Sequence, residues 1–522
     1  MKFIRRLSGF IVVLLLIAVL GGGYLLYFTA YELPFELPFD LPFLPEDEMA
    51  GESGSVLVWT VEGASAPGQQ TASQPGRIAL IDMGGALFPL MDLPEGTSTV
   101  MPCGEAAQSP DGRYFAFYAG RDTGSLYLMD GLQPPQAVDE VQRAACMGNG
   151  TFAFSPDSTR LAYIDYAAAA SGNDFAAGTL KIADAASTTT LFEAERVTAF
   201  DVRDERVGYV SFFTDDDGDA DEAVITIWDG DTASELAVLR PDEPCAFVSS
   251  SVAVLAQDVL SVVLGQQCSS TGQGSWQLYR VDVAAGTAEL RDEDDIVGNF
   301  QTFGRTNVQF AAPDGSAFAF TAPDGVVANT AGLFAVDTSD FAPRQIIDRQ
   351  IVMPANTVPA NATPHLSPDG RWLAFVQTSP GFENTLVIYD LSDLTQRPTE
   401  FSAGSPGDTI SALAFTSDSR QLLAVAGGDE TANNAIVRFE PGGGEPAVVV
   451  RGHHSNRMVV NGDVIAVGDW QFLEDDNEPP YLALVTASTD GMTLNTLFEG
   501  ATIQDVEVTE QRFAVPLAFR RP

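Results

Sequence analysis

The chain has 522 residues, and 45% of them are apolar, which is enough to bury a substantial core. Its charge is lopsided, with 71 acidic residues against 27 basic ones and a formal net charge of −44. A negative field of this size repels polyanions, which argues against nucleic acid as a partner and against binding to an anionic bilayer face. It suits a soluble exported domain that attracts cations or basic partners.

A basic and then apolar segment opens the sequence. An apolar run from Phe10 to Phe28 follows three basic residues: Lys2, Arg5 and Arg6. At about 1.5 Å rise per residue, a helix of this length spans the hydrocarbon core of a bilayer. The basic flank places residues 1–9 in the cytoplasm and everything after the span outside it. We therefore expect a transmembrane signal anchor over residues 10–30.

A cleaved signal peptide is the alternative, because it also has a basic start and an apolar middle. The apolar run is long for that role. A cut after Ala30 would find Phe28 where a small residue is needed. We favour the uncleaved anchor.

Residues 31–54 are predicted to form a stiff stalk. The segments 32–35, 36–39 and 40–43 repeat an acidic residue followed by Leu-Pro-Phe. Proline at every fourth position removes amide donors and favours an extended backbone. The stalk then turns acidic, and residues 55–522 are expected to form the folded ectodomain.

One short pattern recurs along this ectodomain. A Ser-Pro-Asp-Gly-Arg unit, or a variant of it, precedes a run of aromatic and aliphatic residues. Proline presets φ, aspartate bonds its own backbone and glycine takes a positive φ, so each unit predicts a tight turn before a strand. The aspartates are therefore interpreted as turn formers and not as catalysts: Asp111, Asp157, Asp314, Asp369 and Asp418.

The spacing of the units predicts the architecture. A second strand ending in an acid follows each of several turns, as at 126–130, 180–184 and 386–390, and a third strand comes after it. A period of about 45 to 55 residues is that of four-stranded propeller blades. We expect an all-β chain with a single propeller of about eight blades. Seven or nine stay open, because degenerate units are easily split or merged and strands at both ends could share a further blade.

The Ser-Pro-Asp-Gly-Arg unit with its apolar strand resembles the TolB-like propeller repeat, which also occurs in the propellers of dipeptidyl and oligopeptidases. The resemblance extends over nearly all of residues 55–519 and is closest in the five units above. It implies the fold and says little about the ligand, because this repeat serves many roles.

An acidic segment between two strands of one blade suggests a calcium site. Its candidate ligands surround Gly218: Asp215, Asp217, Asp219, Asp221 and Glu222. Carboxylates spaced by two can converge where a glycine allows a sharp turn, as calcium loops require. The segment lacks the length and the distal glutamate of an EF-hand, and a solvated hairpin tip is the alternative. Calcium is the one cofactor that the sequence suggests.

Four cysteines in an exported chain permit two disulfides. Cys245 and Cys268 flank a hairpin whose turn lies near Gln257, so on antiparallel strands they come opposite each other, within disulfide reach. Cys103 and Cys146 each precede the first strand of consecutive blades, which predicts a second bond between them. Four free thiols are the alternative.

Groups for catalysis are scarce. The histidines are His365, His453 and His454, and the sequence has no Gly-x-Ser-x-Gly elbow. We favour a binding or scaffolding propeller that holds a protein, peptide or glycan on one face and is anchored to the membrane by the N-terminal helix. The alternative is an extracytoplasmic hydrolase or lyase that uses carboxylates at the central channel, and clustered acids with raised pKa values would favour it.

Overall fold

The structure is a computed structural model, and it describes residues 54–520 with internal gaps. The gaps are 63–75, 95–96, 98, 102–106, 121–122, 143–151, 166–176, 215–219, 242–243, 257, 269–272, 297–308, 313, 324–330, 347–364, 379–383, 403–407, 429–433, 472–480, 492–493, 499–500 and 503–509. The expected anchor and nearly all of the stalk lie outside the described residues. Within them, no helix is long and apolar enough to cross a membrane.

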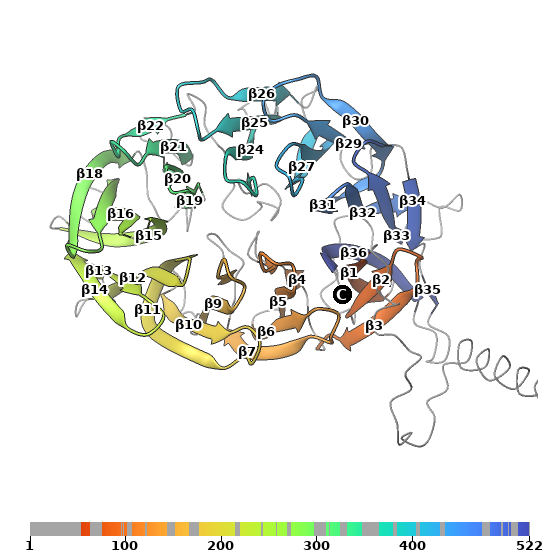
Figure 1. Cartoon of the computed structure of the whole chain (residues 1–522), viewed down its shortest axis with the longest axis horizontal. Helices are drawn as coiled ribbons and strands as arrows, with labels where there is room; N and C mark the ends of the chain where they lie inside the picture. The colour runs from red at the N-terminus through yellow and green to blue at the C-terminus, as the bar shows by residue number, and fades with distance from the viewer. Residues whose placement is uncertain are drawn as a thin grey trace, which may run out of the picture. The chain divides into compact units, whose positions relative to one another are not determined.

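The unit Glu52–Pro522 is built from antiparallel strands that form seven hydrogen-bonded sheets in its described part. Five sheets have four strands and make one blade each, and the two larger sheets each join two blades. The blades follow one another around a ring, with one strand of each nearest the axis (Figure 1). This is a β-propeller.

The strands of blades 1 to 5 follow, from the innermost outward. Blade 1 has β36 (Glu510–Arg520), β1 (Ser55–Glu62), β2 (Gly76–Asp82) and β3 (Leu87–Asp92); blade 2 has β4 (Thr99–Met101), β5 (Tyr114–Gly120), β6 (Thr123–Asp130) and β7 (Gln136–Gln142). Blade 3 has β8 (Phe152–Phe154), β9 (Arg160–Asp165), β10 (Gly178–Asp184) and the first half of β11 (Thr190–Arg203); blade 4 has the second half of β11, β12 (Arg206–Thr214), β13 (Ala220–Trp228) and β14 (Ala233–Leu239). Blade 5 has β15 (Cys245–Ala256), β16 (Val259–Cys268), β17 (Gly274–Asp282) and β18 (Thr287–Ile296).

Blades 6 to 9 follow the same order. Blade 6 has β19 (Gln309–Ala311), β20 (Ala317–Pro323), β21 (Ala331–Asp337) and β22 (Pro343–Gln345); blade 7 has β23 (His365–Leu366), β24 (Trp372–Thr378), β25 (Asn384–Asp390) and β26 (Thr399–Ser402). Blade 8 has β27 (Thr409–Phe415), β28 (Leu422–Gly427), β29 (Asn434–Phe439) and β30 (Ala447–Gly452); blade 9 has β31 (His454–Asn461), β32 (Val464–Gln471), β33 (Tyr481–Ser488) and β34 (Leu494–Phe498). The short β35 (Ala501–Thr502) pairs with β36.

The described strands therefore form nine blades, whereas the sequence favoured about eight. The eight units visible in the sequence are all present, and the terminal strands add a complete ninth blade, because β36 pairs with β1 in antiparallel register. The expected folded region does begin at Ser55, the first residue of β1.

Four of the five recurrent turns share one hydrogen-bond pattern, and in the fifth, which has Ala312 in place of the hydroxyl residue, Asp314 Oδ1 accepts the Ser316 N–H. In the unit at Ser109, the serine hydroxyl donates to Asp111 Oδ1 at 2.5 Å and accepts the Tyr114 N–H at 2.7 Å, while Asp111 Oδ1 accepts the Arg113 N–H at 3.0 Å. The units at Ser155, Ser367 and Thr416 repeat these bonds. The aspartates are turn formers, as predicted. Burial opposes ionisation, but the Ser109 hydroxyl and the Arg113 N–H hold the pKa of Asp111 below its usual range.

Two of these turns also bond the neighbouring blade. Ser158 and Ser419 stand where other units have glycine, and both take a positive φ, 62° and 60°. Their hydroxyls accept the N–H of Asp111 at 3.1 Å and of Asp369 at 3.0 Å, each from the turn of the preceding blade. The bond offsets a backbone conformation that costs an L-residue about 1–2 kcal/mol.

Aromatic residues fill the spaces between blades. Trp276 of blade 5 packs on Phe320 and Phe334 of blade 6, with ring centroids 5.4 and 5.1 Å away, and Phe212 of blade 4 stacks on Phe247 of blade 5 at 5.7 Å. Full burial of such a side chain contributes about 1.5–3 kcal/mol. Each blade is thus stabilised by both of its neighbours.

Arg520, at the end of β36, ties the closing strand to blade 2. Its side chain is fully buried, and its Nε donates to the carbonyl of Gly131 at 3.1 Å. The two Nη atoms donate to the carbonyls of Gly112, at 3.3 Å, and of Arg113 and Gly131. Burial lowers the pKa of Arg520 to about 10.

We expect Arg520→Ala to lower the free energy of unfolding by about 3 kcal/mol, because the carbonyls of Gly112 and Gly131 lose their donor and that of Arg113 keeps only the Gly131 N–H. Arg77→Ala in the same blade is the matched control. It removes an ion pair to Asp92, whose side chain is 78% exposed, so its cost should stay below about 1 kcal/mol. Thermal melts of both variants check the difference, and equal losses would contradict the role given to Arg520.

Candidate functional site

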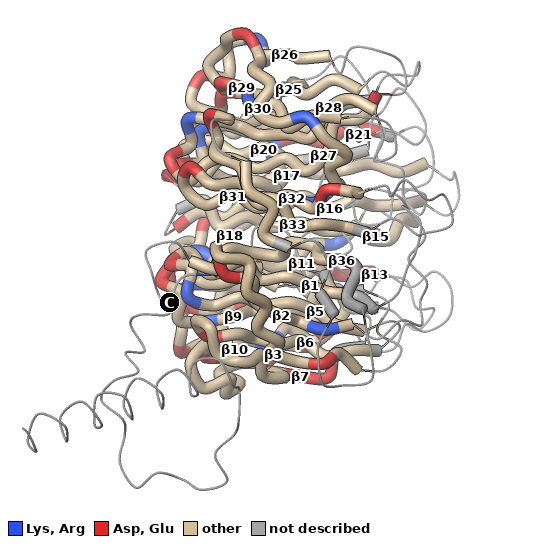
Figure 2. Tube along the Cα trace, turned by 90° about the vertical axis from the view of Figure 1, so that its right-hand side faces the viewer, with Lys and Arg blue, Asp and Glu red and all other residues tan. Residues whose placement is uncertain are grey.

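The two ends of the ring are built differently. In blades 2 to 9 the first two strands join at one end, the turn end, and in every blade the last two strands join there too. The hydrogen-bonded turns and many charged residues lie at this end (Figure 2). The second and third strands, and successive blades, join at the opposite end, the loop end. The long connections leave from strand ends on this side: 63–75, 166–176, 297–308, 347–364, 472–480 and 503–509.

A buried polar cluster lies at the loop end where blades 8 and 9 meet. Asn434, the first residue of β29, brackets the main chain of His454, donating to its carbonyl at 2.8 Å and accepting its N–H at 2.8 Å. Asp469 of β32 accepts the His453 N–H at 2.8 Å and the side-chain amide of Gln471 at 2.7 Å. Its Oδ1 lies 3.1 Å from Nδ1 of His454, which is 1% exposed. We call these five residues the inner polar cluster.

Glycine is required beside this cluster. A Cβ on Gly452 would lie 2.6 Å from Asp469 Oδ1 and 2.6 Å from Cε1 of His454. These approaches are far inside van der Waals contact, so a side chain at position 452 would displace the carboxylate or the imidazole.

The inner polar cluster is suited to positioning and not to nucleophilic chemistry. A carboxylate beside an imidazole is the arrangement that orients a general base. However, Nε2 of His454 is buried and has no hydrogen-bond partner within the part of the chain that the structure describes, so no hydroxyl or thiol there could use it. Asn434, Asp469 and Gln471 could not be found from the sequence, because Asn434 belongs to β29 of blade 8 and the other two belong to β32 of blade 9.

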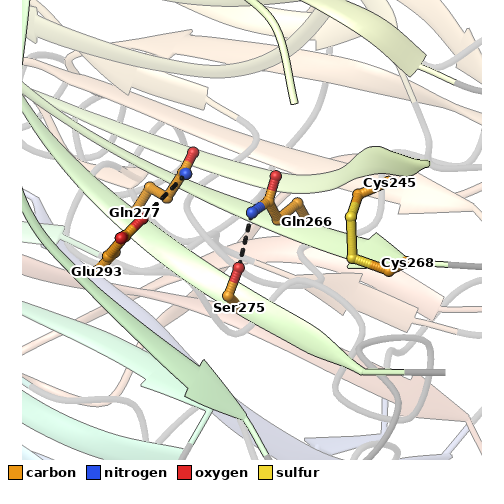
Figure 3. Close-up of a disulfide and its surroundings, with 6 residues drawn as sticks. All are labelled: Cys245, Gln266, Cys268, Ser275, Gln277 and Glu293. Atoms are coloured by element: carbon orange, nitrogen blue, oxygen red, sulfur yellow. Dashed lines mark hydrogen bonds between the residues drawn. A yellow bond between two sulfur atoms is a disulfide. The ribbon is translucent and has the colours of Figure 1, made fainter. Parts of the chain in front are cut away.

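The Cys245–Cys268 disulfide lies at the loop end of blade 5 (Figure 3). The two cysteines are direct partners in the β15–β16 register, as predicted, with Cα atoms 3.8 Å apart. Beside them, Gln266 donates to Ser275 Oγ at 2.8 Å and Gln277 to Glu293 Oε2 at 3.4 Å. Cys103 and Cys146 lie outside the described residues, so the second predicted bond stays a prediction.

The predicted calcium ligands are only partly visible. Asp215, Asp217 and Asp219 lie outside the described residues, Asp221 is exposed at the start of β13, and Glu222 accepts a bond from Arg240 Nε at 3.1 Å. No group of three or more potential metal ligands occurs among the residues that the structure places. A calcium site thus has no support in the described part of this loop.

Two described carboxyl groups have a pKa raised by burial, and they are apart. Burial raises the pKa of Asp201, on the innermost strand of blade 4, to about 6, although its Oδ2 accepts the Val254 N–H of blade 5 at 2.7 Å. Burial also raises the pKa of Asp292, on the outermost strand of blade 5. They belong to an inner and an outer strand, so they do not form the facing pair that glycoside chemistry needs.

The chain matches no protein-family model and no curated protein. Solved structures similar to it include a prolyl endopeptidase, at 14% identity and a TM-score of 0.41; the match covers 76% of this chain and 55% of that one. An oligogalacturonate lyase in complex with manganese has 15% identity and a TM-score of 0.38, and the match covers 82% of this chain and 96% of the lyase. TolB from Acinetobacter baumannii has 13% identity and a TM-score of 0.25, and the match covers 65% of this chain and 79% of TolB.

The chain spans about half the length of the prolyl endopeptidase that it matches. TolB proteins are among the similar structures, and no family model matches that would assign the repeat family. Likeness at this level carries no argument about activity. The fold assignment rests on the strand order described above.

We expect non-reducing peptide mapping to recover a Cys245–Cys268 linkage from the native protein. Cys245→Ser should lower the free energy of unfolding by about 3 kcal/mol, because the bond restricts the unfolded chain between two cysteines 23 residues apart. Reductant should destabilise the parent protein and leave the melt of a Cys245→Ser, Cys268→Ser double variant nearly unchanged. A linkage of Cys245 to Cys103 instead would contradict the β15–β16 register.

Proposed function

We propose that this chain is an extracytoplasmic β-propeller, tethered to the membrane by its N-terminal segment, that binds or scaffolds a protein, peptide or glycan at the loop end of the ring. The observation that carries the proposal is the difference between the two ends. Binding residues in such folds are found mainly on connections that a rigid scaffold positions.

The turn end is poorly suited to binding a partner, because most of its polar groups are already hydrogen-bonded within the ring. Its hydroxyl and carboxylate groups already bond the main chain, as in the Ser109–Asp111 and Ser367–Asp369 pairs, and its arginines pair with strand-end acids, as Arg371 does with Asp390 at 2.7 Å. A partner there would have to compete with bonds that hold the blades together. Among the residues described at the loop end no such pattern recurs, and the strand ends there are the points from which the long connections leave.

Charge and the disulfide support the other parts of the proposal. A net charge of −44 favours a neutral or basic partner surface and disfavours polyanions. A disulfide between strands is typical of exported proteins, which agrees with the basic and apolar N-terminus.

A hydrolase or lyase is the second function that we considered, and Asp201 is the observation in its favour, because a pKa of about 6 suits a general acid. Its carboxylate is committed to a main-chain bond between blades 4 and 5, however, and the other raised acid, Asp292, belongs to an outermost strand. We therefore propose binding and not catalysis.

Affinity capture with the detergent-solubilised full-length protein, followed by mass spectrometry, tests the proposal. Two variants replace residues 347–364 or 472–480 with glycine and serine at equal length, and a control replaces residues 441–445 in the turn-end connection of blade 8. We expect the parent and the control to retain the same partner and at least one loop variant to lose it, with all four proteins melting within a few degrees of one another. Loss of the partner in the control alone would place binding at the turn end and contradict the proposal.

A further inference from the structure

We propose that Arg457 anchors a site for a single carboxylate, the C-terminal carboxylate of a peptide, at the innermost strand of blade 9. This inference rests on the binding function proposed above and specifies the chemistry of its ligand.

Arg457 lies in a bulge of the innermost strand. His454 of β31 pairs with Asp469 of β32, and the next pair is Met458 with Val467. Between these pairs β31 advances by four residues and β32 by only two, so β31 carries two extra residues. The Ser455 hydroxyl holds the bulge, since it donates to the Arg457 carbonyl at 3.3 Å and lies 3.4 Å from the Arg457 N–H. Bulges of this kind redirect a side chain and are frequent at functional sites.

The inner polar cluster fixes one end of this bulge. His454 is held through its main chain by Asn434 and lies beside Asp469. Bonds from blades 8 and 9 therefore hold the strand immediately before the bulge. The main chain at Arg457 is thus fixed in position before any ligand binds. A preorganised guanidinium binds with a smaller entropic cost.

The guanidinium of Arg457 has no hydrogen-bond or ion-pair partner within the described part of the chain, although its side chain is partly buried. Burial alone lowers the pKa of Arg457 to about 10. Buried Arg520 is different, because its guanidinium donates to three main-chain carbonyls. Arg371 and Arg113 are different too, since each pairs with the acid that ends a strand.

A partly buried arginine that has no partner among the described residues is unexpected in this protein. Acidic residues outnumber basic ones by 71 to 27, and a buried charge is costly unless it is paired. A ligand that supplies the missing anion removes this cost on binding. The planar guanidinium fork matches a carboxylate through two parallel hydrogen bonds.

The surroundings favour a peptide carboxylate over a polyanion. The overall negative charge of the protein repels a ligand with many anionic groups. A neutral or basic peptide is not repelled in this way, and its single carboxylate is attracted by the nearby positive charge of Arg457. β31 also ends its sheet on the side of the ring axis, so one edge of this strand faces away from β32 (Figure 1). Main-chain groups on such an edge can pair with an extended peptide.

Isothermal titration of the detergent-solubilised full-length protein with N-acetyl-trialanine tests the site. We expect the free acid of this peptide to bind at least tenfold more tightly than its C-terminal amide. Arg457→Gln should lower the affinity for the free acid at least tenfold and leave the affinity for the amide unchanged. Arg457→Lys should retain part of the preference. Arg451→Gln, on the outermost strand of blade 8 and exposed, is the matched control and should bind as the parent does.

Melting temperature gives a second readout that does not depend on the ligand. Arg457→Met should raise the melting temperature of the free protein, because it removes a desolvated charge without a partner, whereas a structural role would lower it. Equal binding of acid and amide, or a destabilised Arg457→Met, would overturn the proposal. Tighter binding of trigalacturonate than of the free acid would reassign the site to an acidic glycan. If peptide binding fails while capture still recovers a loop-dependent partner, only the carboxylate site is wrong.

Discussion

The pairing of β1 with β36 is the constraint on which the rest of the ring depends. Eight blades are built from consecutive strands, but blade 1 takes its innermost strand from the C-terminal end of the chain. Every blade packs its two faces on neighbours, so a ring without this strand would leave a blade edge and two apolar faces exposed. Arg520, at the end of β36, adds hydrogen bonds across this closure, because it donates to main-chain carbonyls in the turns of blade 2.

A closed ring allows its two ends to serve different purposes. At the turn end, hydroxyl and carboxylate groups satisfy the main chain within each blade, and the serines at positions 158 and 419 extend the bonding to the next blade. These bonds tie the strands of a blade, and some neighbouring blades, together at this end. At the loop end, the rigid strand ends support long connections, the Cys245–Cys268 bond and the inner polar cluster. The proposed binding function and the proposed Arg457 site both rest on this division.

The features that the sequence predicted correctly depend on local signals. The Ser-Pro-Asp turns are recognised from consecutive residues, and the Cys245–Cys268 pair follows from their equal distances to one turn. The blade count was underestimated because the ninth blade combines strands from opposite ends of the chain, and because β11 runs without interruption through two blades. Asn434, Asp469 and Arg457 were missed for a related reason: their roles depend on contact between blades and on a register shift that no local pattern reveals. Similarly, positive φ at Ser158 and Ser419 was not expected, since the bond that offsets it comes from another blade.

Deletion of residues 510–522 tests ring closure most directly. The shortened protein loses β36 and Arg520 but keeps the described strands of blades 2 to 9. We expect its cooperative melt to broaden and shift to a much lower temperature, and a synthetic peptide of residues 510–522 in excess to restore the parent transition by binding the folded ring. A shortened protein that melts as the parent does, with no response to the peptide, would contradict the account.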